Sequence, residues 1–464
     1  MTRRRRRRPG DALAPYLMIL PGWLWLAAFF VTPVIVMVSL SLQTGNFIDG
    51  FRQTFHFGTY ADVVRTYHVQ LVRSLVYGAA ATAACAVVGY PVAYWIAFRA
   101  GRHKSVFLFL LLLPFFVSFV IRTQSWNVVL ADHGVLLGPL KDVGLLPAGF
   151  HLLATPYAVI GGLTYNFLPF MVLPVYVALE RVDPKVIEAS TDLYVTEAPA
   201  GPRARRAPRR PALTVYTVLV LVWLLLPIAV MILFGFNDTG SKVNFTWQGF
   251  TLDWYRHLFA IPNLTSALVN SLTIALVVAV VATLLGTPIG LALGRHRFRG
   301  RGSVDLLMFA AIAAPEIALG AALLSLFIVL GVPRGYWTVV IAHVAFCIPY
   351  VAITVRARMA GHDPTLEEAA RDLGAGPWTA FRLVTLPMLL PGVASGALLC
   401  FALSVDDYVI TSFNAGRTVT FPLWVYSASR TGVPPQVNVM GTLIFAGGLI
   451  IAGANVLFSR RRAA

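Results

Sequence analysis

Three carboxylates, at Glu316, Asp406 and Asp407, lie inside apolar runs that are long enough to cross a membrane. Charged groups at bilayer depth are costly, so they usually face a cavity or a partner. Such groups could compensate the charge of a passing cation, and polar or aromatic side chains could add hydrogen bonds or cation–π contacts. The candidate path residues are therefore Glu316, Asp406, Asp407, Tyr408, Tyr165 and Asn166. A structural alternative stays open, in which such a carboxylate caps a broken helix or pairs with an arginine such as Arg122.

Motifs for catalysis are absent from the sequence. It contains no G-x-x-x-x-G-K-[S/T] phosphate loop, so we do not expect the chain itself to bind ATP. It also contains no H-E-x-x-H motif and no cluster of Cys and His at metal-ligand spacing. His343 stands alone on an apolar run, where an interhelical hydrogen bond is a better explanation than a metal ligand. The sequence thus predicts a protein that is not an enzyme, with no cofactor and no metal.

A polar segment in the second half of the chain has the features of a compact helix-turn-helix. Thr365 can cap a helix whose first turn holds Glu367 and Glu368, where carboxylates favour the helix dipole. Gly374 permits that helix to end in a sharp turn, and Pro377 is suited to start a second short helix. We therefore expect a rigid lever that stands out from the apolar part of the chain.

The composition determines which elements position these residues. Of 464 residues, 58% are hydrophobic and only 12% are charged, which excludes an ordinary soluble domain. Apolar runs of about 20 residues, the length needed to cross a bilayer core, predict an all-α polytopic membrane protein. The expected spans are 16–42, 70–97, 105–122, 153–179, 213–236, 266–293, 303–331, 336–357, 388–412 and 438–458. This gives about ten transmembrane helices.

The basic residues indicate the orientation of these spans. The chain has 37 Lys and Arg against 20 Asp and Glu. The basic residues form clusters that each adjoin an apolar run, at Arg3 to Arg8, Arg99 to Lys104, Arg203 to Arg210, Arg295 to Arg301 and Arg460 to Arg462. By the positive-inside rule, we expect every cluster and both termini to be cytoplasmic. Membrane lipid is the expected partner for these clusters, and nucleic acid is not, because no interleaved aromatic residues accompany the arginines.

An internal repeat divides the chain. Leu71-Val-Arg-Ser-Leu75 is echoed by Leu268-Val-Asn-Ser-Leu272 after 197 residues, and Asp183 to Leu193 is echoed by Asp363 to Leu373 after 180. The shorter offset places extra residues in the first copy, around Asp132 to His151. We therefore predict a first, truncated membrane unit of about four spans (1–195), a Pro/Arg-rich cytoplasmic linker (196–212) and a second unit of about six spans (213–464).

The polar segment resembles a known family motif. Its pattern of Glu368-Ala369-Ala370, Gly374 and Val384-Thr385-Leu386-Pro387 is similar to the EAA loop of ABC-importer permeases, E-A-A-x3-G-x9-I-x-L-P, with Val in place of Ile. In that family the loop docks in a groove of a separate ATPase subunit and passes ATP-driven closure to the pore. The resemblance implies a coupling loop near 361–387, and its residues would be Glu368, Ala369, Ala370, Gly374, Leu386 and Pro387.

The first copy departs from this motif. It retains Glu188 and Ala189 but has Ser190 and Tyr194 at the second Ala position and the Gly position. It also lacks the Leu-Pro end and two spans. We therefore interpret Glu188 and Ala189 as the remainder of a degenerate coupling loop.

Other segments resemble the two permeases of spermidine/putrescine importers. Leu20-Pro-Gly-Trp23 and Tyr165 to Met171 are similar to the first permease, and Pro315 to Gly320 and Leu403 to Phe413 to the second. The resemblance implies an inner-membrane (plasma-membrane) permease for ATP-driven polyamine uptake. It implies an ATPase subunit as partner, homodimeric and the site of ATP hydrolysis, and an extracytoplasmic substrate-binding protein. A second permease chain is left open as a further partner.

Two other functions remain as alternatives at this stage. An ion-coupled secondary transporter would also explain repeats and buried carboxylates, but it gives no reason for the EAA-like loop. A truncated fusion that acts only as an ATPase-binding scaffold would explain the loop and the missing spans. Substrate uptake without ATP would favour the secondary transporter. ATPase binding without any uptake would favour the scaffold.

Overall fold

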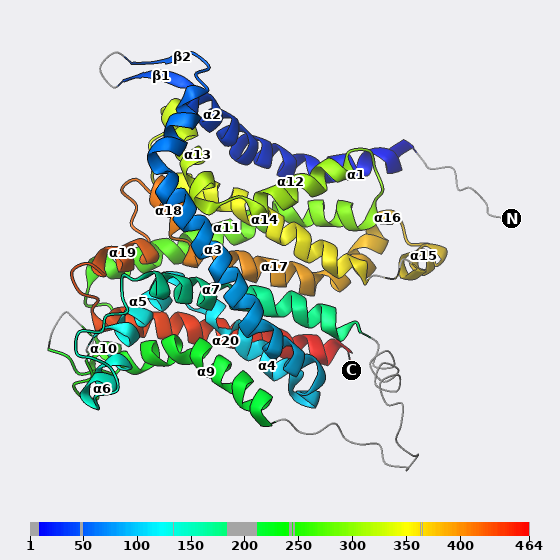
Figure 1. Cartoon of the computed structure of the whole chain (residues 1–464). Coiled ribbons are helices and arrows are strands. Elements are labelled where there is room, and N and C mark those ends of the chain that lie inside the picture. The colour runs from blue at the N-terminus through cyan, green and yellow to red at the C-terminus, as the bar shows by residue number, and fades with distance from the viewer. Residues whose placement is uncertain are drawn as a thin grey trace, which may run out of the picture. The chain divides into compact units, whose positions relative to one another are not determined.

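The chain folds almost entirely into helices. The computed structural model describes residues 9–46, 50–132, 134–182, 211–240, 244, 246–361, 363 and 365–463 (Figure 1). Within these ranges, the strands are β1 (Gln43–Asn46) and β2 (Gly50–Gln53), which pair antiparallel with Gln43 opposite Gln53. This confirms the predicted helical membrane fold.

Several long helices are interrupted by short 3-10 or π segments. In the first half of the chain the elements are α1 (Pro9–Leu26), η1 (Ala27–Val31), α2 (Thr32–Ser41), α3 (Gly58–Phe98), η2 (Gly101–His103), α4 (Lys104–Leu112), η3 (Leu113–Phe116), α5 (Phe119–Leu130), α6 (Leu137–Asp142), α7 (Pro156–Glu180) and α9 (Pro211–Phe234). In the second half they are α10 (Asp253–Arg256), α11 (Pro262–Arg295), α12 (Arg301–Ala313), α13 (Glu316–Val329), α14 (Tyr336–Ala360), α15 (Thr365–Asp372), α16 (Pro377–Ala380), η4 (Phe381–Thr385), α17 (Leu386–Asp406), α18 (Val409–Asn414), α19 (Phe421–Ala428) and α20 (Pro435–Ala463).

The described residues contain seven helices that are long and apolar enough to cross a membrane, or up to nine if two bent pairs each count as one span. The bent pairs are Gly101–Phe116 with Phe119–Leu130 and Arg301–Ala313 with Glu316–Val329, which turn by 95° and 102°. Extended backbone at Val117 and Ala314 interrupts them, so the predicted continuous spans 105–122 and 303–331 are broken helices. The apolar segment Pro435–Ile450 is shorter than a full span, so the count of ten stays a prediction.

The helices form two compact units that do not follow the sequence order. Compact unit 1 contains the described parts of Met1–Thr59, His257–Thr431 and Gly447–Ala464, and compact unit 2 those of Tyr60–Arg256 and Gly432–Ala446. The first helices, α1 and α2, thus belong with α11 to α19, whereas α9 belongs with α3 to α7. The predicted sequence boundaries at 195 and 212 stay a prediction, because residues 183–210 lie outside the described residues.

In compact unit 1, α11 and α14 approach closely through glycines. A Cβ atom added at Gly290 would lie 2.5 Å from the carbonyl oxygen of Ala352, and one at Gly286 would lie 2.8 Å from that of Ile348. Removing a side chain lets two helix backbones pack at short range in a membrane. Cys347 and Cys400 fill the neighbouring contact between α14 and α17, where both are buried and unbridged. These three helices form the base that supports the polar segment.

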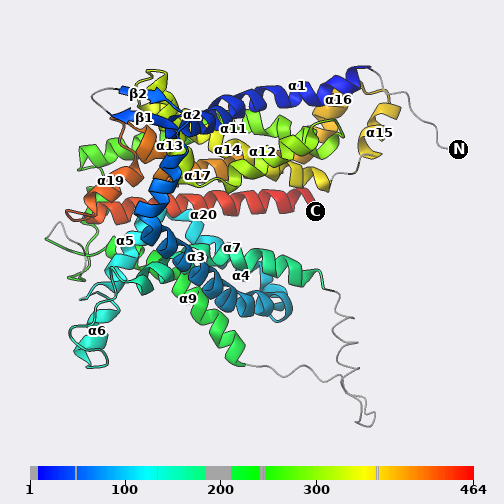
Figure 2. The ribbon, with the colours of Figure 1, turned by 45° about the horizontal axis from the view of Figure 1, so that its top comes forward.

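The two ends of compact unit 1 carry different elements. Figures 1 and 2 show α15 and α16 at one end of its long helices, and β1, β2 and α19 at the other. Hydrogen bonds support this placement, because Ser271 near the start of α11 accepts from the Phe421 amide of α19, while Arg295 at the end of α11 reaches α15. The positive-inside rule predicts that the loops 43–69, 237–265 and 413–437 face outward. The lever and the first and last of these predicted outer loops therefore lie at opposite ends of the long helices.

Compact unit 2 has its own core between α3, α4, α7 and α9. Its buried residues include Trp95, Leu168 and Leu224. The Trp95 indole donates to Thr214 Oγ1 at 2.9 Å, and the Tyr216 hydroxyl donates to the Val88 carbonyl at 3.1 Å. Interhelical hydrogen bonds of this kind fix the helix register in an apolar environment.

Candidate functional site

The lever consists of α15, a glycine turn and α16. α15 ends at Asp372, and Gly374 adopts a φ of +90°, which glycine tolerates and other residues rarely do. The Gly374 amide donates to Arg371 O at 2.9 Å and the Ala375 amide to Ala370 O at 3.0 Å, the two bonds of a Schellman motif. α16 then begins at Pro377. The expected helix, turn and second helix are confirmed.

The start of α15 differs from the expectation in one detail. Thr365 is the first residue of the helix, and its amide donates to the Asp363 carboxylate at 2.9 Å. The expected cap by the Thr365 hydroxyl is therefore wrong, because Asp363 lies two residues earlier and satisfies this free amide itself. Glu367 and Glu368 both lie in the first turn, as expected.

One face of α15 is tied to the helix bundle. Glu367 is buried, and its carboxylate pairs with the guanidinium of Arg295, the last residue of α11. The hydroxyl of Thr385, which is fully buried in η4, donates to the other carboxylate oxygen. Leu386 and Pro387 follow directly and begin α17, so the end of the EAA-like motif is continuous with a candidate membrane helix.

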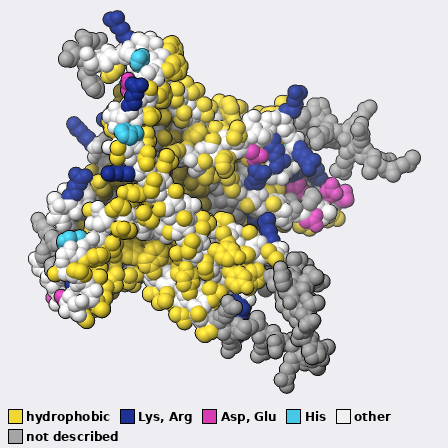
Figure 3. Space-filling model, in the orientation of Figure 1, with side chains coloured by type: hydrophobic (Ala, Val, Ile, Leu, Met, Phe, Trp, Pro, Cys, Tyr) yellow, Lys and Arg dark blue, Asp and Glu magenta, His cyan; other side chains and the backbone are white. Residues whose placement is uncertain are grey.

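The opposite face of the lever is exposed. Glu368 and Ala369 are exposed and Ala370 is half-buried. Leu373 is 91% exposed and Trp378 is 70% exposed, and neither was singled out in the sequence. Their signal was available, because apolar residues in an otherwise polar loop outside the spans are typical of an interface. Charged side chains of both signs gather at this end of compact unit 1 (Figure 3).

The corresponding loop of the first copy cannot be compared in three dimensions. Glu188 and Ala189 lie outside the described residues, as does the predicted linker up to residue 210. Their degenerate character therefore stays a prediction from sequence.

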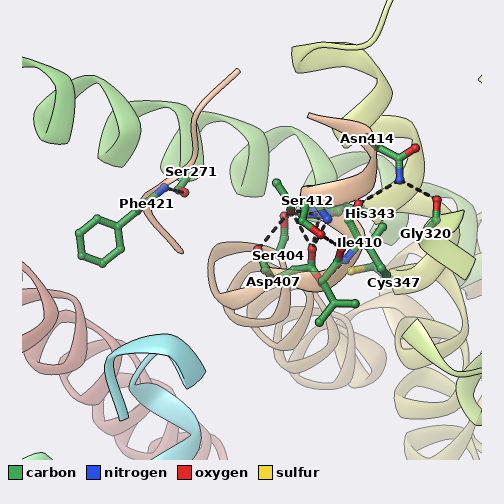
Figure 4. Close-up of polar contacts among 12 residues, drawn as sticks. Ser271, Gly320, His343, Cys347, Ser404, Asp407, Ile410, Ser412, Asn414 and Phe421 are labelled. Atoms are coloured by element: carbon green, nitrogen blue, oxygen red, sulfur yellow. Dashed lines mark hydrogen bonds and ion pairs between the residues drawn. The ribbon is translucent and has the colours of Figure 1, made fainter. Parts of the chain in front are cut away.

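One of the predicted carboxylates, Asp407, lies close to His343 of α14 (Figure 4). His343 Nε2 is 3.1 Å from Asp407 Oδ2 and 2.9 Å from Thr411 Oγ1, and Nδ1 is 2.8 Å from Ser404 Oγ. A neutral imidazole with its proton on Nε2 can donate to the carboxylate and accept from the serine hydroxyl. The expected interhelical hydrogen bonding of His343 is present.

Asp407 also determines where the helix breaks. Its side chain is 5% exposed and accepts from the amide of Thr411 at 2.7 Å, at the start of α18. α17 ends at Asp406, so the predicted span 388–412 stops earlier than expected. The geometry thus favours the capping alternative for Asp407, with the His343 imidazole as a second hydrogen-bond partner.

Glu316 is the more accessible carboxylate. It is the first residue of α13, directly after the 102° break, and it is exposed. It lies within electrostatic range of Asp406 and Asp407, so the structure brings the three predicted carboxylates together. Asp406 is half-buried at the end of α17.

Tyr408 directly follows Asp407, after the end of α17. Its ring lies 4.6 Å from that of Tyr426 in α19. The hydrogen bond and charge of Arg430, which lies 5.6 Å over the Tyr426 ring, hold the pKa of Tyr426 below its usual value. The two tyrosine rings and Arg430 thus contact one another beside the end of α17.

Tyr165 and Asn166 lie in compact unit 2, on α7. Tyr165 is fully buried, donates to Leu224 O at 3.2 Å and packs its ring against Trp126 and Trp223. The Asn166 amide donates to Gly162 O at 2.9 Å. Tyr165 thus has a packing role, and a path role for this pair stays a prediction.

Comparisons with known proteins identify relatives of this chain. Residues 286–463 match the family model described as "Binding-protein-dependent transport system inner membrane component". The chain is 38% identical over 247 residues to the spermidine/putrescine transport system permease protein PotC of Haemophilus influenzae, covering 53% of this chain and 95% of that protein. It is 39% identical to the putrescine transport system permease protein PotI of Escherichia coli, covering 53% and 89%.

Another relative matches a smaller share of the chain. The spermidine/putrescine transport system permease protein PotB of Haemophilus influenzae is 34% identical over 170 residues, covering 36% of this chain and 59% of that protein. The relatives thus each match about half of the chain or less, which agrees with two permease units joined in one chain.

Two solved structures show weaker similarity. An inward-facing MetNI methionine ABC transporter has a TM-score of 0.38 at 19% identity, covering 44% of this chain and 97% of that chain. A bacterial ABC transporter involved in the import of alginate has a TM-score of 0.41 at 18% identity, covering 56% and 99%. The assignment depends instead on the sequence relatives. With 95% of PotC covered at 38% identity, this chain belongs to the binding-protein-dependent transport system inner membrane components, which are multi-pass permeases and not enzymes.

Proposed function

We propose that this chain is the transmembrane permease of an ATP-driven importer for linear polyamines such as spermidine and putrescine. The observation that carries the proposal is the lever, which has a buried face tied to α11 and α17 and an exposed face that holds Glu368, Leu373 and Trp378. The names of the relatives support the substrate class. An ion-coupled secondary transporter gives no account of such a lever.

The proposed partners follow from this function. ATP hydrolysis takes place on a separate, homodimeric ATPase that receives the exposed face of α15, and an extracytoplasmic binding protein delivers the substrate. The lever end and both termini face the cytoplasm, in agreement with the arginine clusters. The division into 1–195, 196–212 and 213–464 is part of the same proposal, with the first copy as the weaker coupling partner.

The docking face can be tested in proteoliposomes that contain this chain, its ATPase and its binding protein. We expect Leu373→Asp to weaken ATPase association about 30-fold, the effect of a typical interface hot spot, and to abolish ATP-dependent spermidine uptake. Leu252→Asp is the matched control, because Leu252 is also an exposed leucine but lies in the predicted outer loop. Uptake without ATP would contradict the proposal, and ATPase binding without any uptake by the wild-type chain would identify a scaffold.

The substrate path is the second testable part of the proposal. Glu316 directly follows the 102° break in a span and Asp406 is the last residue of α17, whereas the Asp407 carboxylate bonds to His343 and to the Thr411 amide of α18. We expect Glu316→Gln combined with Asp406→Asn to slow spermidine uptake several-fold while ATPase copurification is retained, because the change removes charge and keeps shape. Spermidine uptake by Asn166→Ala is measured in the same assay to test Asn166, the weaker candidate path residue in compact unit 2. Unchanged uptake at normal abundance would remove the two carboxylates from the path.

A further inference from the structure

A single carboxylate connects three segments at the base of the lever. Arg295 Nη2 at the end of α11 donates to Oε2 of Glu367, and Thr385 Oγ1 in η4 donates to Oε1. Both oxygens of the carboxylate are therefore used, each by a different segment. Charge-assisted hydrogen bonds of this kind are stronger and more directional than neutral ones.

Burial shows that this contact is part of the bundle. The side chain of Glu367 is 9% exposed and that of Arg295 30%, while Thr385 is fully buried. A charge that is withdrawn from water must be paired to be tolerated. The adjacent Glu368 points outward and is exposed, so two consecutive glutamates have different surroundings.

Both backbone connections of α15 contain glycine. Gly361 precedes the helix, and Gly374 and Gly376 follow it. By contrast, α11 and α17 pack closely on α14, where a Cβ added at Gly290 or Gly392 would lie within 2.8 Å of another atom. The side-chain tie of Glu367 therefore adds a direct connection between α15 and this closely packed bundle.

The internal repeat offers a comparison within the chain. The 197-residue offset places Phe98 at the position of Arg295, and the 180-residue offset places Ile187 at the position of Glu367. Both charged partners are thus replaced by apolar residues in the first copy, whose lever motif is degenerate. The pairing of the two changes indicates that Arg295 and Glu367 serve one purpose.

We propose that Glu367, held by Arg295 and Thr385, is the positioning residue that transmits movement of the second coupling loop to α11 and α17. This inference rests on the proposed function, in which Glu368 and its neighbours contact the ATPase. Glu367 does not contact the partner. Through its bonds to Arg295 and Thr385, Glu367 couples a displacement of α15 to a displacement of α11 and α17.

The test uses the reconstituted importer and measures spermidine uptake per ATP hydrolysed, together with ATPase copurification. We expect Glu367→Gln to retain the ATPase but to lower the uptake-to-hydrolysis ratio about tenfold, as for residues with strong energetic coupling. Arg295→Lys keeps the positive charge, so its uptake-to-hydrolysis ratio should stay close to that of the wild type. Arg295→Ala removes the charge, so its ratio should fall as in Glu367→Gln.

A second variant separates coupling from folding. Arg295→Phe combined with Glu367→Ile restores the apolar pair of the first copy, so we expect normal abundance and thermal stability but a low ratio. Asp305→Asn is the control, because it removes an ion pair to Arg356 between α12 and α14 that does not involve the lever. A normal ratio in Glu367→Gln or in the apolar double variant overturns the positioning role. No ATP-driven uptake by the wild-type chain overturns the proposed function instead.

Discussion

The helix pair α3–α7 in compact unit 2 and the pair α11–α14 in compact unit 1 each pack at a glycine, but at different distances. A Cβ added at Gly89 would lie 3.3 Å from a side-chain methyl group of Leu168, whereas one at Gly286 would lie 2.8 Å from the backbone carbonyl oxygen of Ile348. These residues correspond under the repeat, since Gly89 and Gly286 are 197 positions apart and Leu168 and Ile348 are 180 apart. Both copies have thus kept the close contact on which the membrane bundle depends.

The polar ties of the two copies differ. His343 of α14, which contacts Asp407, corresponds to Leu163 of α7, and the sequence predicts that the first copy lacks the span that would carry the carboxylate. Arg295 and Glu367 correspond to Phe98 and Ile187. In both comparisons, the first copy has apolar residues where the second copy has polar partners.

Physical chemistry explains this pairing of changes. A buried polar group that loses its partner keeps its desolvation cost, whereas an apolar replacement of both partners is close to neutral. The first copy can therefore remain well packed without its ties, as the core around Trp95 and Leu168 shows. From the sequence we predict that the first copy lacks a complete lever, and Phe98 and Ile187 offer it no polar tie to the membrane helices.

The largest expected effect concerns His343. His343→Leu copies the first-copy residue into compact unit 1 but leaves Asp407, which is 5% exposed, without its imidazole hydrogen-bond partner. We expect a loss of roughly 3–5 kcal/mol in the free energy of unfolding, the cost of breaking a buried pair from one side. Thermal unfolding in detergent measures it.

The comparison of the copies predicts how this loss is recovered. Asp407→Asn added to His343→Leu removes the unpaired charge and still offers an oxygen to the Thr411 amide, so the double variant should be more stable than the single one. Leu163→Ala in compact unit 2 is the control for simple loss of volume. A double variant that is as unstable as the sum of both changes would show that the two residues do not act as a pair.

Local patterns in the sequence predicted the lever well. The turn at Gly374 and the helix start at Pro377 depend on residues within one or two turns, so composition and spacing determine them. The broken spans were harder, because the apolar run 303–331 does not reveal that the chain turns by 102° before Glu316. Hydropathy measures length and polarity and not direction.

Contacts between distant segments could not be predicted. Arg295 and Glu367 are 72 residues apart, and His343 and Asp407 are 64 apart, so their pairing depends on how α11, α14 and α17 pack. Glu368 is marked by the motif. Glu367 is predicted only to lie in the first turn of the helix, because its partners Arg295 and Thr385 are distant in the sequence. Leu373 and Trp378 are not positions of the motif, so the motif does not indicate that they are exposed on the lever.

The smallest expected effect concerns the insertion around Asp132 to His151, which only the first copy has. Asp132 accepts from Lys141 Nζ at 3.0 Å and lies 2.6 Å from His151 Nδ1, and mainly the Lys141 hydrogen bond holds its pKa below the usual value. A carboxyl with a lowered pKa stabilises the folded loop above its unfolded pKa of about 3.9, and this contribution is lost as the pH falls through the lower folded value. We therefore expect hydrogen exchange of residues 134–151, corrected for intrinsic rates, to increase on acidification from pH 7 to below 3, and Asp132→Asn to show raised exchange already at pH 7 with little further change. The loop at 331–335 of compact unit 1 is the internal reference, and equal acid sensitivity in the Asn variant would show that the insertion is held by packing and not by this carboxylate.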